Sequence, residues 1–246
     1  TTNNGLSDNI VNKIFIDSDG NIWICSVSGI SKLGKKPFEI FNVNFGLPGN
    51  DILCTFADDD GNIWGGSYKG PFLITQTGKV RTFNEKYGLT ANTLTTFKIT
   101  ADNENKLWLG TYFGITCFDG NRFHTYINPL WQERGNAIYD IIIDQQNKFL
   151  LAIDGGLFEF SEGRYNAPEK FKQLNNKDIR SIKKDKNNNL WVCTSEGVYI
   201  IGEYNLLINL SNGLSNNSCN DIYIDSSGVA WIATDNGLNK IFFQPD

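Results

Sequence analysis

Short apolar runs alternate with polar turns along the whole chain, and the alternation recurs about every 40 residues. Residues 14–33 read "IFIDSDGNIWICSVSGISKL", in which three apolar runs are separated by turns at Asp17–Gly20 and near Gly29. A fourth apolar run, "FEIF", follows at 38–41. Runs of this length bounded by Gly, Asn and Asp indicate β-strands joined by tight turns. The pattern therefore predicts four short antiparallel strands in each copy.

The recurrence is clearest at one tryptophan, and the residue at this place in each copy defines the Trp position. The six are Trp23, Trp64, Trp108, Leu150, Trp191 and Trp231, in steps of 41, 44, 42, 41 and 40 residues. Six residues earlier each copy has an aspartate, the hairpin Asp: Asp17, Asp58, Asp102, Asp144, Asp185 and Asp225. Gly or Asn stands three residues before the Trp position, a small residue two after it, and Gly six after it. Repetition of a four-stranded unit at this period predicts a β-propeller.

The hairpin Asp is predicted to shape a turn. Gly and Asn tolerate the left-handed backbone that a tight hairpin needs, and Asp can accept hydrogen bonds from amides two residues on. "DDDGN" at Asp58–Asn62 most resembles a calcium loop, but the Glu at loop position twelve and the flanking helices of such a site are missing. Six copies of one aspartate indicate a scaffold role, and the tryptophans are predicted to be core.

These observations predict an all-β fold, a β-propeller of six repeats with five four-stranded blades and a three-stranded sixth. The last copy has runs for three strands, at 219–224, 230–234 and 237–243, before the sequence reaches Asp246. We expect one propeller domain over 1–246, with repeats at about 5–45, 46–87, 88–130, 131–174, 175–211 and 212–246. Because the chain starts at Thr1 and contains no Met, we expect it to be a fragment of a longer protein.

Composition narrows the classes of function. The net charge of −5 and the pI of about 5.0 argue against nucleic acid as a partner. No apolar run approaches 18 residues, so we expect no membrane insertion by this chain. Five cysteines form no C-x-x-C, and Cys25 and Cys193 occupy the small position after the Trp position, so they are interpreted as small buried residues. We expect no cofactor and no metal.

The single histidine, His124, lies in "RFHTY", where other copies have Glu39 or Arg81. This is the polar side of an outer strand, so a surface residue is favoured, with a lone ligand contact as the alternative. Catalysis by a Ser/His/Asp set, or a metal site of several histidines, is hard to build with one His. No catalytic residue is predicted.

The stretches "GLSDNIVNKIFIDSDGNIWICSVSGISKL", "GLPGNDILCTFADDDGNIWGGS" and "GLSNNSCNDIYIDSSGVAWIATDNGLNKI" resemble the two-component regulator propeller repeat. The resemblance covers residues 5–243; the fourth copy departs most, with "QERGN" for the Gly-Leu opening and Leu150 for Trp. It implies a periplasmic, non-catalytic sensor region of a hybrid two-component histidine kinase of the Bacteroides type. It further implies an oligosaccharide ligand and other domains of the parent receptor as partners. A homodimer is left open.

Two other classes of function compete with the sensor. One is a protein-interaction scaffold, a common role of propellers. The other is an enzyme similar to streptogramin lyases, whose repeats have a similar rhythm but which use a catalytic His and a metal. The "GLSxN" opening favours the regulator repeat, and the scarcity of His disfavours the lyase.

A ligand face can be predicted from chain direction. In an up-and-down blade, the turn between strands two and three lies on the same face as the crossover to the next blade. These turns vary between copies, and they place Tyr68, Lys69, Tyr112 and Phe113 on adjacent blades, with Trp131 and Arg134 in the crossover into blade four. Aromatic faces beside directional donors suit a sugar or another polar ligand. The alternatives are that Trp131 fills a gap in the irregular fourth blade, or that this face meets another domain.

Overall fold

The computed structural model describes residues 1–33, 39–90, 94–128 and 137–242, which form β-strands and short 3-10 turns. The chain divides into two compact units, Thr1–Ile138 and Tyr139–Asp246. Within the described residues there are five four-stranded sheets and one three-stranded sheet, each one blade of a β-propeller. The predicted all-β propeller class and the strand number of each blade are therefore confirmed.

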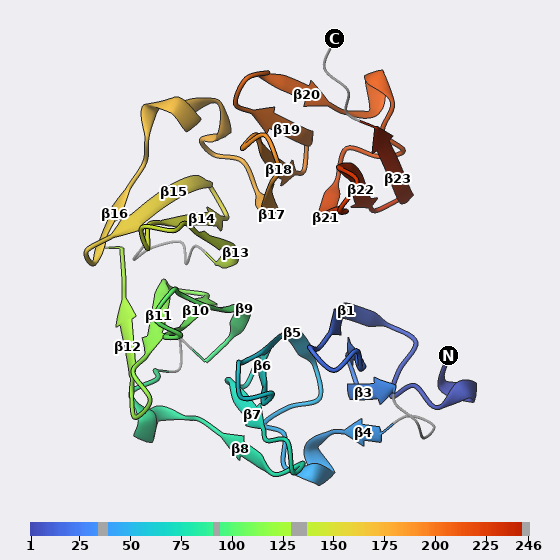
Figure 1. The fold of residues 1–246 in the computed structure, drawn as a ribbon, viewed down its shortest axis with the longest axis vertical. Helices are drawn as coiled ribbons and strands as arrows, with labels where there is room; N and C mark the ends of the chain where they lie inside the picture. Colours follow the sequence, from blue (N-terminus) through green and yellow to red (C-terminus); the bar gives the residue numbers. More distant parts are fainter. Residues whose placement is uncertain (34–38, 91–93, 129–136, 243–246) are drawn as a thin grey trace. The chain divides into compact units, whose positions relative to one another are not determined.

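The first unit contains blades 1 to 3, and in each of them the strands pair in chain order (Figure 1). Their bounds are β1 (Val11–Ile16), β2 (Ile22–Ser26), β3 (Gly29–Leu33) and β4 (Glu39–Phe41); β5 (Ile52–Ala57), β6 (Ile63–Ser67), β7 (Phe72–Ile74) and β8 (Val80–Thr82); β9 (Thr96–Ala101), β10 (Leu107–Thr111), β11 (Ile115–Phe118) and β12 (Phe123–Tyr126). The 3-10 turns among the described residues of this unit are η1 (Thr2–Asn4), η2 (Val43–Phe45) and η3 (Glu85–Tyr87).

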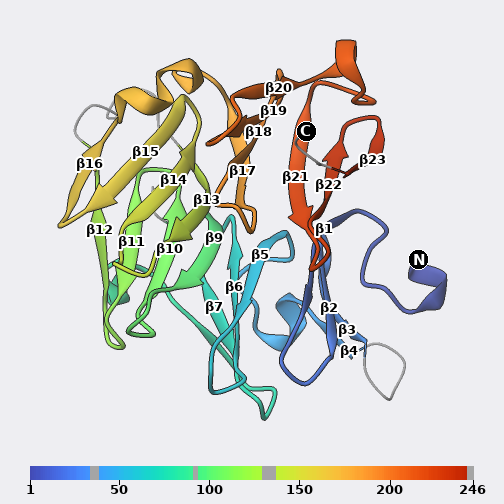
Figure 2. The same cartoon turned by 45° about the horizontal axis from the view of Figure 1, so that its top comes forward.

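The second unit holds blade 4 from Tyr139 onward and blades 5 and 6, and the turned view in Figure 2 shows β13 to β16 running side by side. Their bounds are β13 (Ile138–Ile143), β14 (Phe149–Ile153), β15 (Gly156–Ser161) and β16 (Arg164–Asn166); β17 (Ile179–Lys184), β18 (Leu190–Thr194), β19 (Gly197–Ile201) and β20 (Leu206–Ile208); β21 (Cys219–Ile224), β22 (Val229–Thr234) and β23 (Gly237–Phe242). Two 3-10 turns, η6 (Glu169–Leu174) and η7 (Leu210–Asn212), precede blades 5 and 6.

The hairpin between the first two strands has the predicted conformation in all six blades. The Gly or Asn three residues before the Trp position has a left-handed backbone, with φ of 79°, 72°, 60°, 56°, 62° and 88° for Gly20, Gly61, Asn105, Asn147, Asn188 and Gly228. In every copy the hairpin Asp also accepts a hydrogen bond from the amide four residues on, at 2.8–3.0 Å. In five copies it accepts the predicted bond from the amide two residues on. The carboxylate therefore closes the turn.

The second carboxylate oxygen of the hairpin Asp binds the tryptophan. The indole Nε1 donates to this oxygen wherever the Trp position holds Trp, at 2.8 Å in blade 1 and 3.3 Å in blade 6. The same bond joins Trp64, Trp108 and Trp191 to their own hairpin Asp. A buried indole needs an acceptor for its N–H, and the turn supplies it. The repeat pattern predicts a buried Trp and a turn-forming Asp, but it does not predict the hydrogen bond between them.

The hydrophobic core lies between consecutive blades. Trp23 and Cys25 of blade 1 pack with Ile52 and Ile63 of blade 2, and Trp64 of blade 2 packs with core residues of blade 3. The same pairing joins blade 4 to blade 5 and blade 5 to blade 6 in the second unit. Each blade is thus stabilised mainly by its neighbours in sequence, as in other repeat proteins.

The Gly-Leu-x-x-Asn opening of the repeat is also structural. Its leucine is buried at Leu47, Leu89 and Leu214. Its asparagine Oδ1 accepts a hydrogen bond from an amide of the preceding 3-10 turn, seven residues earlier: Thr2 to Asn9, Val43 to Asn50 and Leu210 to Asn217. The motif that carries the family resemblance therefore fixes the crossover between blades.

All five cysteines are buried and have free thiols. Burial raises the pKa of Cys25 to about 11 and that of Cys54 to about 12. The interpretation of Cys25 and Cys193 as small buried side chains is confirmed.

Candidate functional site

Four of the six residues predicted for the ligand face lie in the turns between the second and third strands of blades 2 and 3. Tyr68 and Tyr112 are 53% and 42% exposed. The ring of Tyr112 lies 5.3 Å from that of Phe113, centroid to centroid, and Lys69 is exposed beside Tyr68. The turns therefore present aromatic rings and a cation to solvent.

These turns adjoin the crossovers, as chain direction predicted. Thr95, in the crossover into blade 3, donates its hydroxyl to the carbonyl of Tyr68 at 3.4 Å. The aliphatic stem of Lys69 passes Gly49, in the crossover into blade 2, close enough that a Cβ there would meet its Cδ at 3.5 Å. Trp131 and Arg134, the other two predicted residues, lie outside the described residues.

A Ser or Thr three residues after the Trp position holds the turn that presents these side chains. The Ser67 hydroxyl donates to the carbonyl of Gly70 at 2.9 Å, and the Thr111 hydroxyl donates to Gly114 at 2.8 Å. Blades 1, 5 and 6 have the same bond, whereas blade 4 has Ile153 at this position. The tyrosines therefore project from a rigid turn, which limits the entropy lost when a ligand binds.

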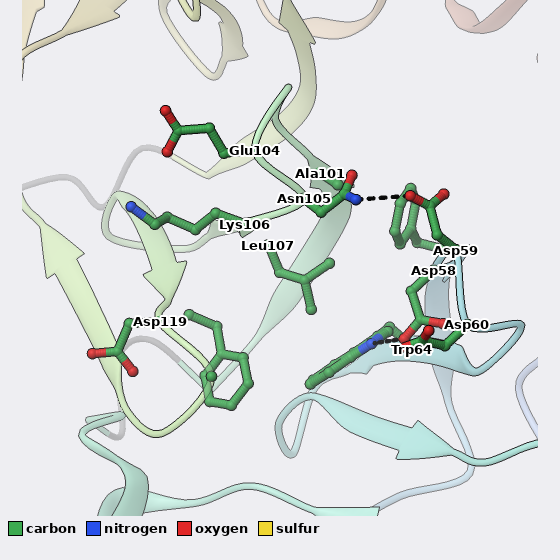
Figure 3. A pocket seen from close by; sticks show the side chains of 13 residues that line it. Asp58, Asp59, Asp60, Trp64, Ala101, Glu104, Asn105, Lys106, Leu107 and Asp119 are labelled. Atoms are coloured by element: carbon green, nitrogen blue, oxygen red, sulfur yellow. Dashed lines mark hydrogen bonds between the residues drawn. The ribbon is translucent and has the colours of Figure 1, made fainter.

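A groove of about 450 Å³ opens at the other end of the same blades, between the hairpins of blades 2 and 3 (Figure 3). Its walls include Phe56, Trp64, Leu107 and Phe118. Five carboxylates and one lysine surround it: Asp58, Asp59, Asp60, Glu104, Asp119 and Lys106. The repeated aspartates indicated a scaffold role, and nothing in the sequence pattern predicted the groove.

Hydrogen bonds already hold part of this acidic rim. The Asn105 amide donates to Asp59 at 2.8 Å and so joins the two hairpin tips, as Figure 3 shows. Asp119 accepts from the amides of Arg122 and Asn121, and these bonds, followed by that from His124, hold its pKa well below the usual range. Among the described residues, no three His, Cys, Asp or Glu side chains are grouped so that they could hold a metal ion.

His124 is a surface residue, as the sequence favoured. Its side chain is 56% exposed on β12, and its Nε2 lies 2.8 Å from Asp119. It lies in an outer strand and pairs opposite Cys117. Its hydrogen-bond partner, Asp119, lies in the third-to-fourth turn of its own blade.

A buried ion pair links the inner strands of the second unit. Asp140, with 6% of its side chain exposed, accepts from Lys183 Nζ at 2.9 Å and from the amide of Ile182 at 3.1 Å. Ser181 lies between two carboxylates, 3.2 Å from Asp140 and 2.8 Å from Asp221. Since the buried charge has several donors, the cluster fits a role in joining blades 4, 5 and 6.

Comparison with known proteins places this architecture. The model of the family "Two component regulator propeller" matches residues 5–28, 46–69, 173–196 and 213–236, within blades 1, 2, 5 and 6. No curated protein sequence matches the chain.

Solved structures match almost the whole chain. The extracellular domain of a hybrid two-component system from B. thetaiotaomicron has a TM-score of 0.81 at 22% identity, over 96% of this chain and 34% of that one. A second such domain from this organism has a TM-score of 0.69 at 20% identity, over 98% and 39%. Virginiamycin B lyase from Staphylococcus aureus has a TM-score of 0.70 at 14% identity, over 96% and 85%. The chain thus spans about a third of the first two structures, and all three share its fold.

The repeats, the hairpin chemistry and these likenesses define the class: the chain is a β-propeller built from a repeat of about 40 residues. More particularly, four of its six repeats match the model of the two-component regulator propeller family. No helix within the described residues has the length and apolar character needed to cross a membrane.

Proposed function

We propose that this chain is a non-catalytic, extracytoplasmic ligand-binding propeller of a two-component signalling receptor. The family match and the likeness to two extracellular domains of hybrid two-component systems support this role. The ligand we propose is an oligosaccharide, bound at the face that carries Tyr68, Lys69, Tyr112 and Phe113. Trp131 and Arg134 remain part of the same proposal.

One observation carries the placement of the ligand: exposed tyrosines stand at equivalent turns of adjacent blades. A tyrosine ring offers a flat apolar surface for the C–H face of a sugar, and its hydroxyl can donate and accept hydrogen bonds. A stiff turn holds each ring in place through Ser67 or Thr111. Exposed aromatic side chains of this size are otherwise expected at surfaces that bind a partner.

Two alternatives have a specific observation behind them. The same exposed tyrosines would suit a protein partner, since Tyr is enriched at protein interfaces. The fold likeness to virginiamycin B lyase suggests an enzyme as the second alternative. The chain has one His, however, and this His is exposed and paired with Asp119. That arrangement supports a binding module better than a lyase.

The test is calorimetric titration of the purified chain with defined oligosaccharides, using the double variant Tyr68→Ala/Tyr112→Ala. We expect an affinity loss of about tenfold or more, since each aromatic contact is worth about 1 kcal/mol. Tyr223→Ala is the matched control, because Tyr223 is also exposed, at 65%, but lies in β21 of the second unit. Circular dichroism checks the fold of each variant.

An unchanged affinity in the double variant removes this face from consideration. A screen of the same chain against polysaccharides, esters and streptogramins tests the non-catalytic part separately. Turnover of any of these substrates contradicts it.

A further inference from the structure

The fourth repeat has Leu150 at the Trp position, and a groove opens beside this leucine. Trp23, Trp64, Trp108 and Trp191 are buried, with exposures of 1–8%. Leu150 is a smaller side chain, yet it is only half-buried. The groove between blades 4 and 5 has a volume of about 490 Å³, and Leu150 and its hairpin Asp, Asp144, both line it. This groove is therefore lined by a leucine at the position where four other repeats have a buried indole.

The floor of this groove is apolar and partly aromatic. It is formed by Phe149, Leu150, Phe171, Leu190 and Ile201. Phe149 and Leu190 are 5% exposed and Phe171 is 7% exposed, so the floor is firmly packed from below. A flat apolar ligand can therefore bury its face against rings and branched side chains without reorganising the core.

The rim of the groove is positively charged. It has three lysines, Lys148, Lys170 and Lys184, against two carboxylates, Asp144 and Glu159. Glu159 is engaged by Lys170 at 2.7 Å, and Lys170 also lies 4.8 Å from the centre of the Phe171 ring. Hydrogen bonding by the Lys148 amide, with smaller contributions from the Lys184 and Lys148 charges, keeps the pKa of Asp144 below its usual value. At neutral pH the rim has one positive charge in excess.

The groove between blades 2 and 3 provides an internal comparison. It lies at the equivalent place in the repeat, because Trp64 lines it where Leu150 lines the second groove. Its Trp position is filled, and its rim has five carboxylates against one lysine. The two grooves lie at equivalent places in the repeat but differ in the residue at the Trp position and in the sign of their charge.

We propose that the groove between blades 4 and 5 binds a planar aromatic anion. The ring would lie on Leu150 and the phenylalanines, and the anionic group would meet the Lys148 and Lys184 ammonium groups. A ring buried in an apolar groove gains from area removed from water, and lysine at the rim gives the charge preference. This site is separate from the tyrosine face and does not depend on it.

The test titrates the full chain with 8-anilinonaphthalene-1-sulfonate as the probe. Binding is monitored by the fluorescence of the probe. We expect saturable binding of one probe. Leu150→Trp restores the side chain of the other repeats and replaces the leucine on which the ring would lie, so probe affinity should fall about tenfold or more while the unfolding temperature is kept. Lys184→Gln should lower the affinity for the anionic probe by about threefold and leave the affinity for the uncharged N-phenyl-1-naphthylamine unchanged.

Lys106→Gln is the matched control, because Lys106 lines the acidic groove and its loss should leave anion binding unchanged. The proposal is overturned if the wild type shows no saturable binding, or if folded Leu150→Trp binds the probe as the wild type does. If Leu150→Trp does not fold, Lys184→Gln decides. The charged site is overturned if this variant loses affinity for both probes equally, or keeps the wild-type affinity for both.

Discussion

At the residue scale, the hairpin Asp combines two structural tasks in one carboxylate. One oxygen closes the turn, through the amide four residues on, and the other accepts the indole N–H. Asp17 shows the electrostatic result: burial raises its pKa, but hydrogen bonds from Trp23, Asn21 and Asp19 outweigh burial, and the net pKa is lowered. The pKa of Asp185 is lowered in the same way, because its hydrogen bonds outweigh the effect of burial.

These shifts predict loss of stability in acid. For Asp225, the Ser227 hydroxyl and further hydrogen bonds lower the pKa from 3.8 to about 2. A carboxyl whose pKa is lower in the folded state stabilises the fold above the unfolded value and loses this contribution as pH falls through the folded one. We therefore expect the unfolding temperature, followed by circular dichroism, to be level near pH 5 and to fall between about pH 4 and pH 2.

Asp225→Asn should make that fall shallower, because the variant has one fewer depressed carboxyl to protonate. A wild-type unfolding temperature that stays constant or rises over this range contradicts the role given to the hairpin Asp.

The sequence predicted the turn bonds of this residue but not its bond to the indole. Turn chemistry is local, so the spacing of Asp and Gly was enough. The bond from Trp23 to Asp17 depends on where the indole N–H points after the chain has reversed direction. The constant six-residue spacing between the hairpin Asp and the Trp position was the available signal.

At the element scale, the second strand of one blade meets the first strand of the next at the small position of the repeat. A Cβ added to Gly110 would lie 2.5 Å from the carbonyl oxygen of Ile138, and one added to Gly66 would lie 2.5 Å from that of Thr96. Cys25 and Cys193 occupy this position in blades 1 and 5 and are fully buried. The side chain here is therefore limited by the backbone of the neighbouring blade.

Gly110→Ala should destabilise the chain by about 1–3 kcal/mol, because the methyl group must displace backbone of the adjacent strand. Urea unfolding measures the change in free energy. Gly49→Ala is the control: a Cβ there meets only the Lys69 side chain, at 3.5 Å or more, and should be tolerated. Equal stability of the two variants contradicts the proposed close approach.

The strand pattern was predictable, whereas the irregularity of the first strands was not. Pairing jumps from Val11–Ser26 to Lys13–Cys25, so the first strand has one extra residue, and β5, β17 and β21 show the same shift. A single bulged residue disturbs the alternation too little to be seen in a short apolar run.

At the scale of the whole molecule, burial depends on the neighbouring blade. Ile99, Ile182 and Ile222, on the first strands of blades 3, 5 and 6, are at most 2% exposed and pack with residues of the preceding blade. In these three blades the first strand therefore gains burial from the adjacent sheet.

The same dependence explains what could be predicted of the sites. Tyr68 and Tyr112 stand out within single repeats, so the sequence could place them in their turns. The groove beside Leu150 combines side chains of two blades and of η6, and no single repeat shows that combination. Its one visible sign was the loss of Trp from the fourth copy.

We expect the recurring positions to form the scaffold and the departures from the repeat to mark binding sites. Calorimetric unfolding of two reciprocal variants in adjacent blades, Trp191→Leu and Leu150→Trp, tests this expectation most directly. Trp191→Leu removes a fully buried indole and its bond to Asp185, so we expect a loss of about 2 kcal/mol or more and a fall of several degrees in the unfolding temperature. Leu150→Trp enters an open groove, so its unfolding temperature should equal or exceed that of the wild type. Equal losses in the two variants would contradict the account, because Leu150 would then be as much a part of the packed core as Trp191.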